Sequence, residues 1–211
     1  MKAAQNEVGT QVKLISFLTS DLGAPLPLHI SLSRPVVLET ATKDDFLENL
    51  TGAVQHSKVH PFTFSARSLF WYASPDSNRK FLVLRVSATG NRTQKQGGDA
   101  GGSKNQNAPL VKLLKRCNTI VEFFGQPTLY AFHDGVNEGA FHVSIAWTFD
   151  ELDEAKRMRT LGLLQTDDHA AIRSWEVDVA GIKAKIGNQV THLALPTTGS
   201  GTKGPVKNLF C

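Results

Sequence analysis

The tetrapeptide His29-Ile30-Ser31-Leu32 returns 113 residues later as His142-Val143-Ser144-Ile145. Both copies lie in runs where apolar and polar residues alternate, and this period of two predicts strands with one buried face. The apolar sets expected in the core are Leu28, Ile30 and Leu32 in the first run and Phe141, Val143, Ile145 and Trp147 in the second. The His and Ser of each copy should then share the opposite face, about 6–7 Å apart along the strand.

A His and a hydroxyl presented twice are suited to proton transfer around a phosphate. One imidazole can accept a proton while the other donates one, and the hydroxyls can hold non-bridging oxygens. A zinc site is the main alternative, but zinc needs three or four ligands, and neither strand face adds another. The remaining histidines are interpreted as structural or surface residues: His56, His60, His133, His169 and His192.

No metal or cofactor is therefore expected, and a metal-free reaction on RNA fits these residues. RNA carries its own nucleophile, the 2′-hydroxyl. A base removes that proton, the oxygen attacks the adjacent phosphorus, and an acid protonates the departing 5′-oxygen.

The rest of the chain predicts alternating strands and helices. Strands are expected at 11–18, 25–33, 62–72, 79–87, 175–186 and 189–195, and helices at 42–55, 109–124 and 150–164. Each motif strand is followed by a helix and a hairpin, so the two halves repeat one plan. This predicts an α+β fold of pseudo-twofold antiparallel sheets, with helices outside and a central cleft. Residues 1–211 should form a single bilobal catalytic domain, with a mobile loop at 89–107 and a loose tail at 196–211.

Composition is that of an ordinary globular protein of 211 residues, and no apolar run is long enough for a membrane span. Two cysteines favour a reducing compartment, cytosolic or nuclear. Nine basic residues and one acid lie between Ser77 and Val121, so this zone has a net charge of +8, whereas the whole chain has +4. Such a zone suggests a polyanion partner, and a solvated surface is the alternative.

The two His-x-Ser motifs resemble those of the 2H phosphoesterase superfamily. Within it, residues 28–33 and 141–147 are similar to the eukaryotic U6 snRNA phosphodiesterases, as are 78–84 and 185–188. The resemblance runs from about Pro25 to Leu195. It implies a nuclear 3′→5′ exoribonuclease that trims the oligouridine 3′ end of U6 snRNA. We further expect a monomer that does not contact a membrane. The product would end in a 2′,3′-cyclic phosphate or a terminal phosphate.

The resemblance also implies roles for individual residues. His29 and His142 would be catalytic, as base and acid or the reverse, and Ser31 and Ser144 would bind the scissile phosphate. The family stacks a terminal base on an aromatic residue shortly before the second motif, and Tyr130 and Phe132 both compete for this place. Two alternatives stay open. One is another 2H activity, such as 2′,3′-cyclic nucleotide hydrolysis or RNA end processing, and the other is a non-catalytic RNA-binding module.

Overall fold

The computed structural model describes residues 1–8, 12–74, 77–89, 107–130 and 140–197. Its helices are α1 (Lys2–Val8), α2 (Lys43–Gln55), α3 (Ala108–Phe123), α4 (Glu154–Gly162) and α5 (Ala170–Arg173), with short 3-10 turns at Thr40–Thr42, Leu163–Gln165 and Asp167–His169. Its strands are β1 (Ile15–Ser16), β2 (Phe62–Ala73), β3 (Lys80–Thr89), β4 (His142–Thr148), β5 (Glu176–Val179), β6 (Gly181–Ile186) and β7 (Gln189–Ala194). Within the described ranges, no helix has the length and apolar character needed to cross a bilayer.

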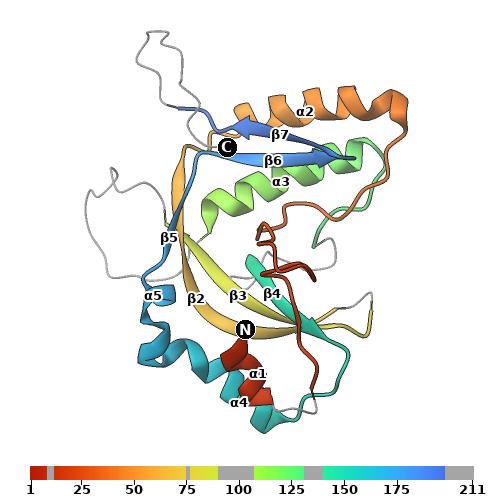
Figure 1. Ribbon diagram of the computed structural model, residues 1–211. Coiled ribbons are helices and arrows are strands. Elements are labelled where there is room, and N and C mark those ends of the chain that lie inside the picture. The colour runs from red at the N-terminus through yellow and green to blue at the C-terminus, as the bar shows by residue number, and fades with distance from the viewer. Residues whose placement is uncertain (9–11, 75–76, 90–106, 131–139, 198–211) are drawn as a thin grey trace, which may run out of the picture.

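Five strands form one antiparallel sheet in the order β1-β4-β3-β2-β5. The long strands β2 and β3 curve strongly, so the sheet is shaped like part of a barrel (Figure 1). Among the described strands, β6 and β7 pair with each other and not with the main sheet, and Gly187 turns between them with φ of 58°. Mixed helices and antiparallel sheets confirm the predicted α+β class.

Two groups of helices cover opposite ends of this curved sheet (Figure 1). The helices α2 and α3 bury apolar residues at helical spacing, such as Leu50 and Val54 in α2 and Leu113 and Cys117 in α3. With β2, β3, β4 and the β6–β7 hairpin they form the larger core. The smaller core lies at the other end, where Ala4 of α1 and Leu152, just before α4, meet Trp71.

The sequence predicted most of these elements, but the structure changes the bounds of three expected ones and adds a helix. The helices at 42–55 and 109–124 and both hairpins are confirmed. The expected strand at 11–18 is reduced to Ile15–Ser16, and the helix at 150–164 begins only at Glu154, after the Asp153 side chain caps it. The expected strand at 175–186 divides at Ala180, because β5 joins the main sheet beside β2 while β6 turns away. The helix α1 was not predicted.

Candidate active site

The first motif lies in an extended segment that forms few β-bridges with the rest of the chain. Between Pro25 and Ser33 only two isolated bridges form, so the expected regular strand is wrong. The alternation nevertheless holds at the motif: His29 and Ser31 are exposed, while Ile30 is half-buried against the larger core. Leu28 departs from the prediction, because 40% of its surface is exposed.

The second motif opens β4. Val143 is buried, whereas His142 and Ser144 are half-buried and share the other face. Directly after Ser144 the pairing register with β3 shifts by one residue, since Leu82 pairs with Ala146 but Val83 pairs with Ser144. Ile145 is therefore the extra residue of a β-bulge.

The bulge reverses the expected alternation in the second half of β4. Ala146 and Thr148 are fully buried, while Ile145 and Trp147 are half-buried. The prediction that Ile145 and Trp147 continue the core face of Val143 is therefore wrong. One inserted residue shifts the pleat by one position, and every side chain beyond it changes face.

One contact brings the two motifs together: Ile30 forms an antiparallel bridge with Val143. In antiparallel pairing the next positions face each other crosswise, so His29 lies across from Ser144 and Ser31 lies across from His142. Side chains at opposed positions have Cβ atoms about 4.5–5.5 Å apart. Four polar side chains, far apart in sequence, thus share one small area.

The surroundings of His142 determine which ring nitrogen is free. Its Nδ1 lies 3.0 Å from the backbone oxygen of Ala140, which can only accept, so Nδ1 carries the proton and Nε2 is left for a substrate. The ring of Tyr72, from β2, lies 5.8 Å from the imidazole, although β3 runs between their strands. Burial, and to a smaller extent the charge of Arg85, lowers the pKa of His142, while the bond to Ala140 acts in the opposite direction.

Arg85 stands next to the second motif, a position that sequence analysis did not identify. It pairs with His142 across β3 and β4, so both side chains lie on one face. Its guanidinium carbon lies 3.9 Å from the ring centroid of Phe70, and its buried Nε has no hydrogen-bond partner in the described part of the chain. Only the strand register could have placed Arg85 and Tyr72 here.

The two aromatic candidates for base stacking have different outcomes. Phe132 lies outside the described residues. Tyr130 packs partly against the larger core, and its hydroxyl donates to the same Ala140 oxygen, at 2.6 Å. Burial raises the pKa of Tyr130 to about 12, and its φ of 60° is rare for a residue with a side chain. Tyr130 is thus fixed just before the second motif, which keeps it a candidate.

Three of the remaining histidines form hydrogen bonds away from the two motifs. His56 contacts the Gly52 oxygen, His60 the Pro196 oxygen, each at 2.8 Å, and His169 the Thr166 hydroxyl at 2.9 Å. His192 pairs across the β6–β7 hairpin, and His133 lies outside the described residues. Across the described ranges, no three His, Cys, Asp or Glu residues are grouped so as to hold a metal ion.

The basic zone of the sequence divides into separate surfaces. Lys112, Lys115 and Arg116 are exposed on α3, whose buried side packs with Val143 and so covers the sheet face opposite to that of His142. Lys80 is bound to Glu151 at 2.6 Å. Arg92, Lys95 and Lys104 lie outside the described residues.

Comparison with known proteins places this arrangement in a family. The sequence is 36% identical over 193 residues to U6 snRNA phosphodiesterase 1 of Neurospora crassa, an alignment covering 85% of this chain and 50% of that protein, so the chain spans about half the length of this relative. This relative confirms the resemblance found in the sequence.

Solved structures have the same fold. Kluyveromyces marxianus Usb1 with uridine monophosphate superposes with a TM-score of 0.60 at 18% identity, covering 92% of this chain and 88% of the other. A second structure of Usb1 from the same yeast superposes with a TM-score of 0.58, covering 92% of this chain and 87% of the other. Usb1 has the 2H phosphoesterase fold, which confirms the predicted architecture. The model of the HVSL family, described as an uncharacterised conserved protein, matches residues 1–194, and the chain therefore belongs to the HVSL family.

Proposed function

We propose that this protein is a metal-independent RNA phosphodiesterase that trims RNA from the 3′ end, and that its substrate is the oligouridine end of U6 snRNA in the nucleus. The observation that carries this proposal is the Ile30–Val143 bridge, since it sets the two His-x-Ser motifs against each other. The name of the Neurospora relative supports U6 snRNA as the substrate, and the uridine monophosphate in the Usb1 structure supports a uridine end.

The reaction needs only the groups of this site and the RNA itself. One imidazole takes the proton of the 2′-hydroxyl on the ribose that precedes the scissile phosphate. The 2′-oxygen forms a bond to phosphorus while the bond to the 5′-oxygen breaks, and the second imidazole protonates that oxygen. The shortened RNA ends in a 2′,3′-cyclic phosphate, which water can open, and the terminal nucleoside leaves. Ser31 and Ser144 bind the non-bridging oxygens.

We assign His29 as the base and His142 as the acid. In the free protein, the lowered pKa of His142 favours its neutral form, which by itself would suit a base. A phosphate bound beside Arg85 opposes the charge of the guanidinium and therefore favours the protonated imidazole in the complex. The assignment is tested with RNA that carries sulfur in place of the 5′-bridging oxygen, because a thiolate leaves without protonation. This substrate should restore cleavage by His142→Ala and not by His29→Ala, and the reverse pattern would exchange the two roles.

The function itself is tested with a labelled oligouridine whose products are identified by mass spectrometry. His29→Ala and His142→Ala should each lower kcat by about 10²–10⁴-fold. His56→Ala, in an exposed ring outside the site, is the matched control and should be neutral. Excess EDTA should leave the rate unchanged, and a 2′-deoxy sugar before the scissile phosphate should prevent cleavage.

Each other result identifies a different activity. Folded histidine variants with near-wild-type rates would refute the paired mechanism. Turnover of a small 2′,3′-cyclic nucleotide without cleavage of oligouridine would indicate another 2H activity. Binding of oligouridine without any turnover would indicate a non-catalytic RNA-binding module.

A further inference from the structure

A cluster of aromatic side chains with one arginine lies at the far end of β4 from His142. We call Phe17, Phe81, Trp147 and Phe149, together with Arg79, the aromatic platform. The rings of Phe17 and Phe81 are parallel within 8°, with centroids 6.2 Å apart, and those of Trp147 and Phe149 meet edge to face at 4.8 Å. The guanidinium carbon of Arg79 lies 4.5 Å from the Trp147 centroid and 5.8 Å from that of Phe149.

The platform faces the same side of the sheet as the candidate catalytic residues. Phe81 pairs with Trp147 and Val83 pairs with Ser144, and paired residues point to one face. Phe81 and Val83 are two positions apart on β3, so Trp147 and Ser144 also share a face. The two rows lie about 7 Å apart along the sheet, roughly the spacing of neighbouring units in an extended nucleic acid strand. The Ile145 bulge makes this possible, because three residues along a regular strand would put Trp147 on the opposite face.

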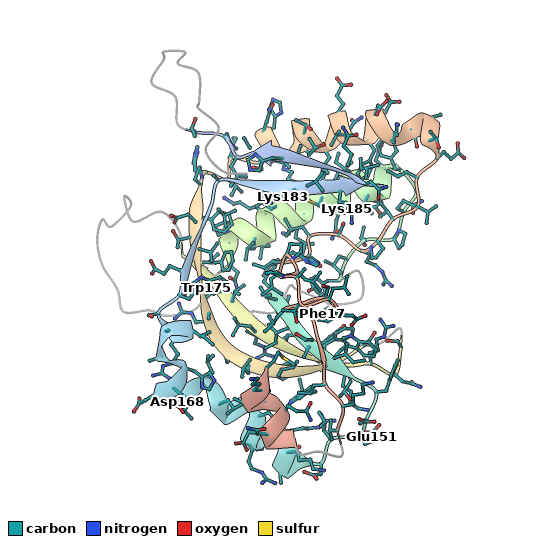
Figure 2. All side chains as sticks on the ribbon, viewed as in Figure 1. Phe17, Glu151, Asp168, Trp175, Lys183 and Lys185 are labelled. Atoms are coloured by element: carbon teal, nitrogen blue, oxygen red, sulfur yellow. The ribbon has the colours of Figure 1, made fainter. Side chains whose placement is uncertain are left out.

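These side chains are more exposed than a core requires. Phe149 exposes 57% of its surface, Arg79 is exposed, and Phe81 and Trp147 are half-buried. Phe17 lies beside β4, where its backbone donates to the Ile145 oxygen (Figure 2). No carboxylate of the described residues forms an ion pair with Arg79, whereas the adjacent Lys80 is bound to Glu151. Aromatic faces beside an unpaired cation are what single-stranded nucleic acids bind.

The place of the aromatic platform along β4 indicates which nucleotide it would contact. Tyr130 is tied to Ala140, on the other side of the motif, so aromatic groups flank the phosphate site at both ends. A phosphodiester likewise has one nucleoside on each side. The leaving 3′-terminal nucleoside carries no further phosphate, whereas the chain continues on the 5′ side with another one. Arg79, which forms no ion pair with a carboxylate of the described residues, therefore matches the 5′ side.

We infer that the aromatic platform stacks the base immediately 5′ of the scissile phosphate, and that Arg79 contacts the phosphate preceding that nucleotide. This inference rests on the proposed function. It assigns to the site a second nucleotide position, so that substrates are recognised by more than the nucleoside being removed.

The test compares oligouridines that lack one base, either before or after the scissile phosphate, with the ribose retained. For the wild type, removal of the 5′-side base should lower kcat/KM by about 5- to 150-fold. Phe81→Leu and Trp147→Leu should show a similar loss on intact oligouridine and little further loss on this abasic substrate. Phe123→Leu, an exposed ring on α3, is the matched control and should keep the full effect of the base.

Arg79→Gln provides a second measurement, in an exposed side chain that forms no ion pair with a carboxylate of the described residues. It should weaken cleavage of the trinucleotide UpUpU but not of UpU, because UpU lacks the preceding phosphate. Three results would overturn the inference: equal losses on intact and abasic RNA in the platform variants, a wild type indifferent to the 5′-side base, or a base effect found only at the 3′-terminal nucleoside. Failure of the proposed function is distinct, since the wild type would then cleave none of these RNAs.

Discussion

A disulfide between residues 30 and 143 would test the contact on which the candidate site depends. Opposed residues of an antiparallel pair have Cα atoms about 4.5–5.5 Å apart, within the range a disulfide requires. Ile30→Cys/Val143→Cys should therefore cross-link under mild oxidation. Both side chains point away from His29 and His142, so the oxidised protein should keep its cleavage activity.

The gain in stability follows from the length of the loop that the bond closes. The two positions are 113 residues apart, and the loop-closure relation then gives about 4.8 kcal/mol at 25 °C. The packing lost on substitution is the same in both redox forms, so it cancels when one variant is compared oxidised and reduced. For a chain of this size the difference corresponds to a Tm shift of about 10–20 °C as an upper bound.

The assay is thermal unfolding of the oxidised and reduced variant, with the cross-link verified by peptide mass. Cys211 is changed to Ser, while Cys117 can stay, because burial raises the pKa of its thiol to about 11 and leaves little reactive thiolate at neutral pH. Ile30→Cys/Ala146→Cys is the matched control, since Ala146 lies further along β4. A pair at 30 and 143 that stays reduced, or a control that cross-links equally well, would show that the first motif does not lie against β4.

Three further variants have defined expected outcomes. Arg85→Met removes a charge that, after burial, lowers the pKa of His142, so the limb of the kcat/KM profile controlled by His142 should move to higher pH; an unmoved limb would exclude this coupling. The stability that His142 contributes as a neutral group is present above pH 6.5 and is lost as pH falls toward its folded pKa, and Arg85→Met should flatten this slope in denaturant titrations. Tyr130→Phe loses the bond to Ala140 and should lower the free energy of unfolding by about 1 kcal/mol, and a change near zero would mean that the hydroxyl bonds equally well to water. Gly181→Ala places a Cβ 2.6 Å from the backbone oxygen of Leu193, so it should lower the stability by about 1–3 kcal/mol, and unchanged melting would contradict the close packing at the start of β6.

Helical spacing and turn residues were sufficient to predict the two long helices and both hairpins. The sequence also predicted which motif residues face the core, because His142 and Val143 do take opposite faces of β4. The pairing partner of the first motif was not predictable, because a single bridge between two residues produces no repeating pattern in the sequence. The charge count could not show that the basic residues divide between surfaces: Arg79 directly precedes β3, whereas Lys112 lies on α3, which covers the opposite face of the sheet.

The Ile145 bulge shows where alternation alone misleads. A regular β4 would send Trp147 into the core and Ala146 to the face of His142. The space at Ala146 is closed, because Trp71 and Leu82 already fill the smaller core around it. A regular β4 would place Ile145 opposite Leu82. Packing there accepts the methyl group of Ala146 and not the larger side chain of isoleucine, because overfilling a close-packed core is costly. The small size of Ala146 thus favours the inserted residue, and the same insertion turns Trp147 toward Ser144. In this way a packing requirement on one face of β4 produces, on the other face, the aromatic surface beside the phosphate site.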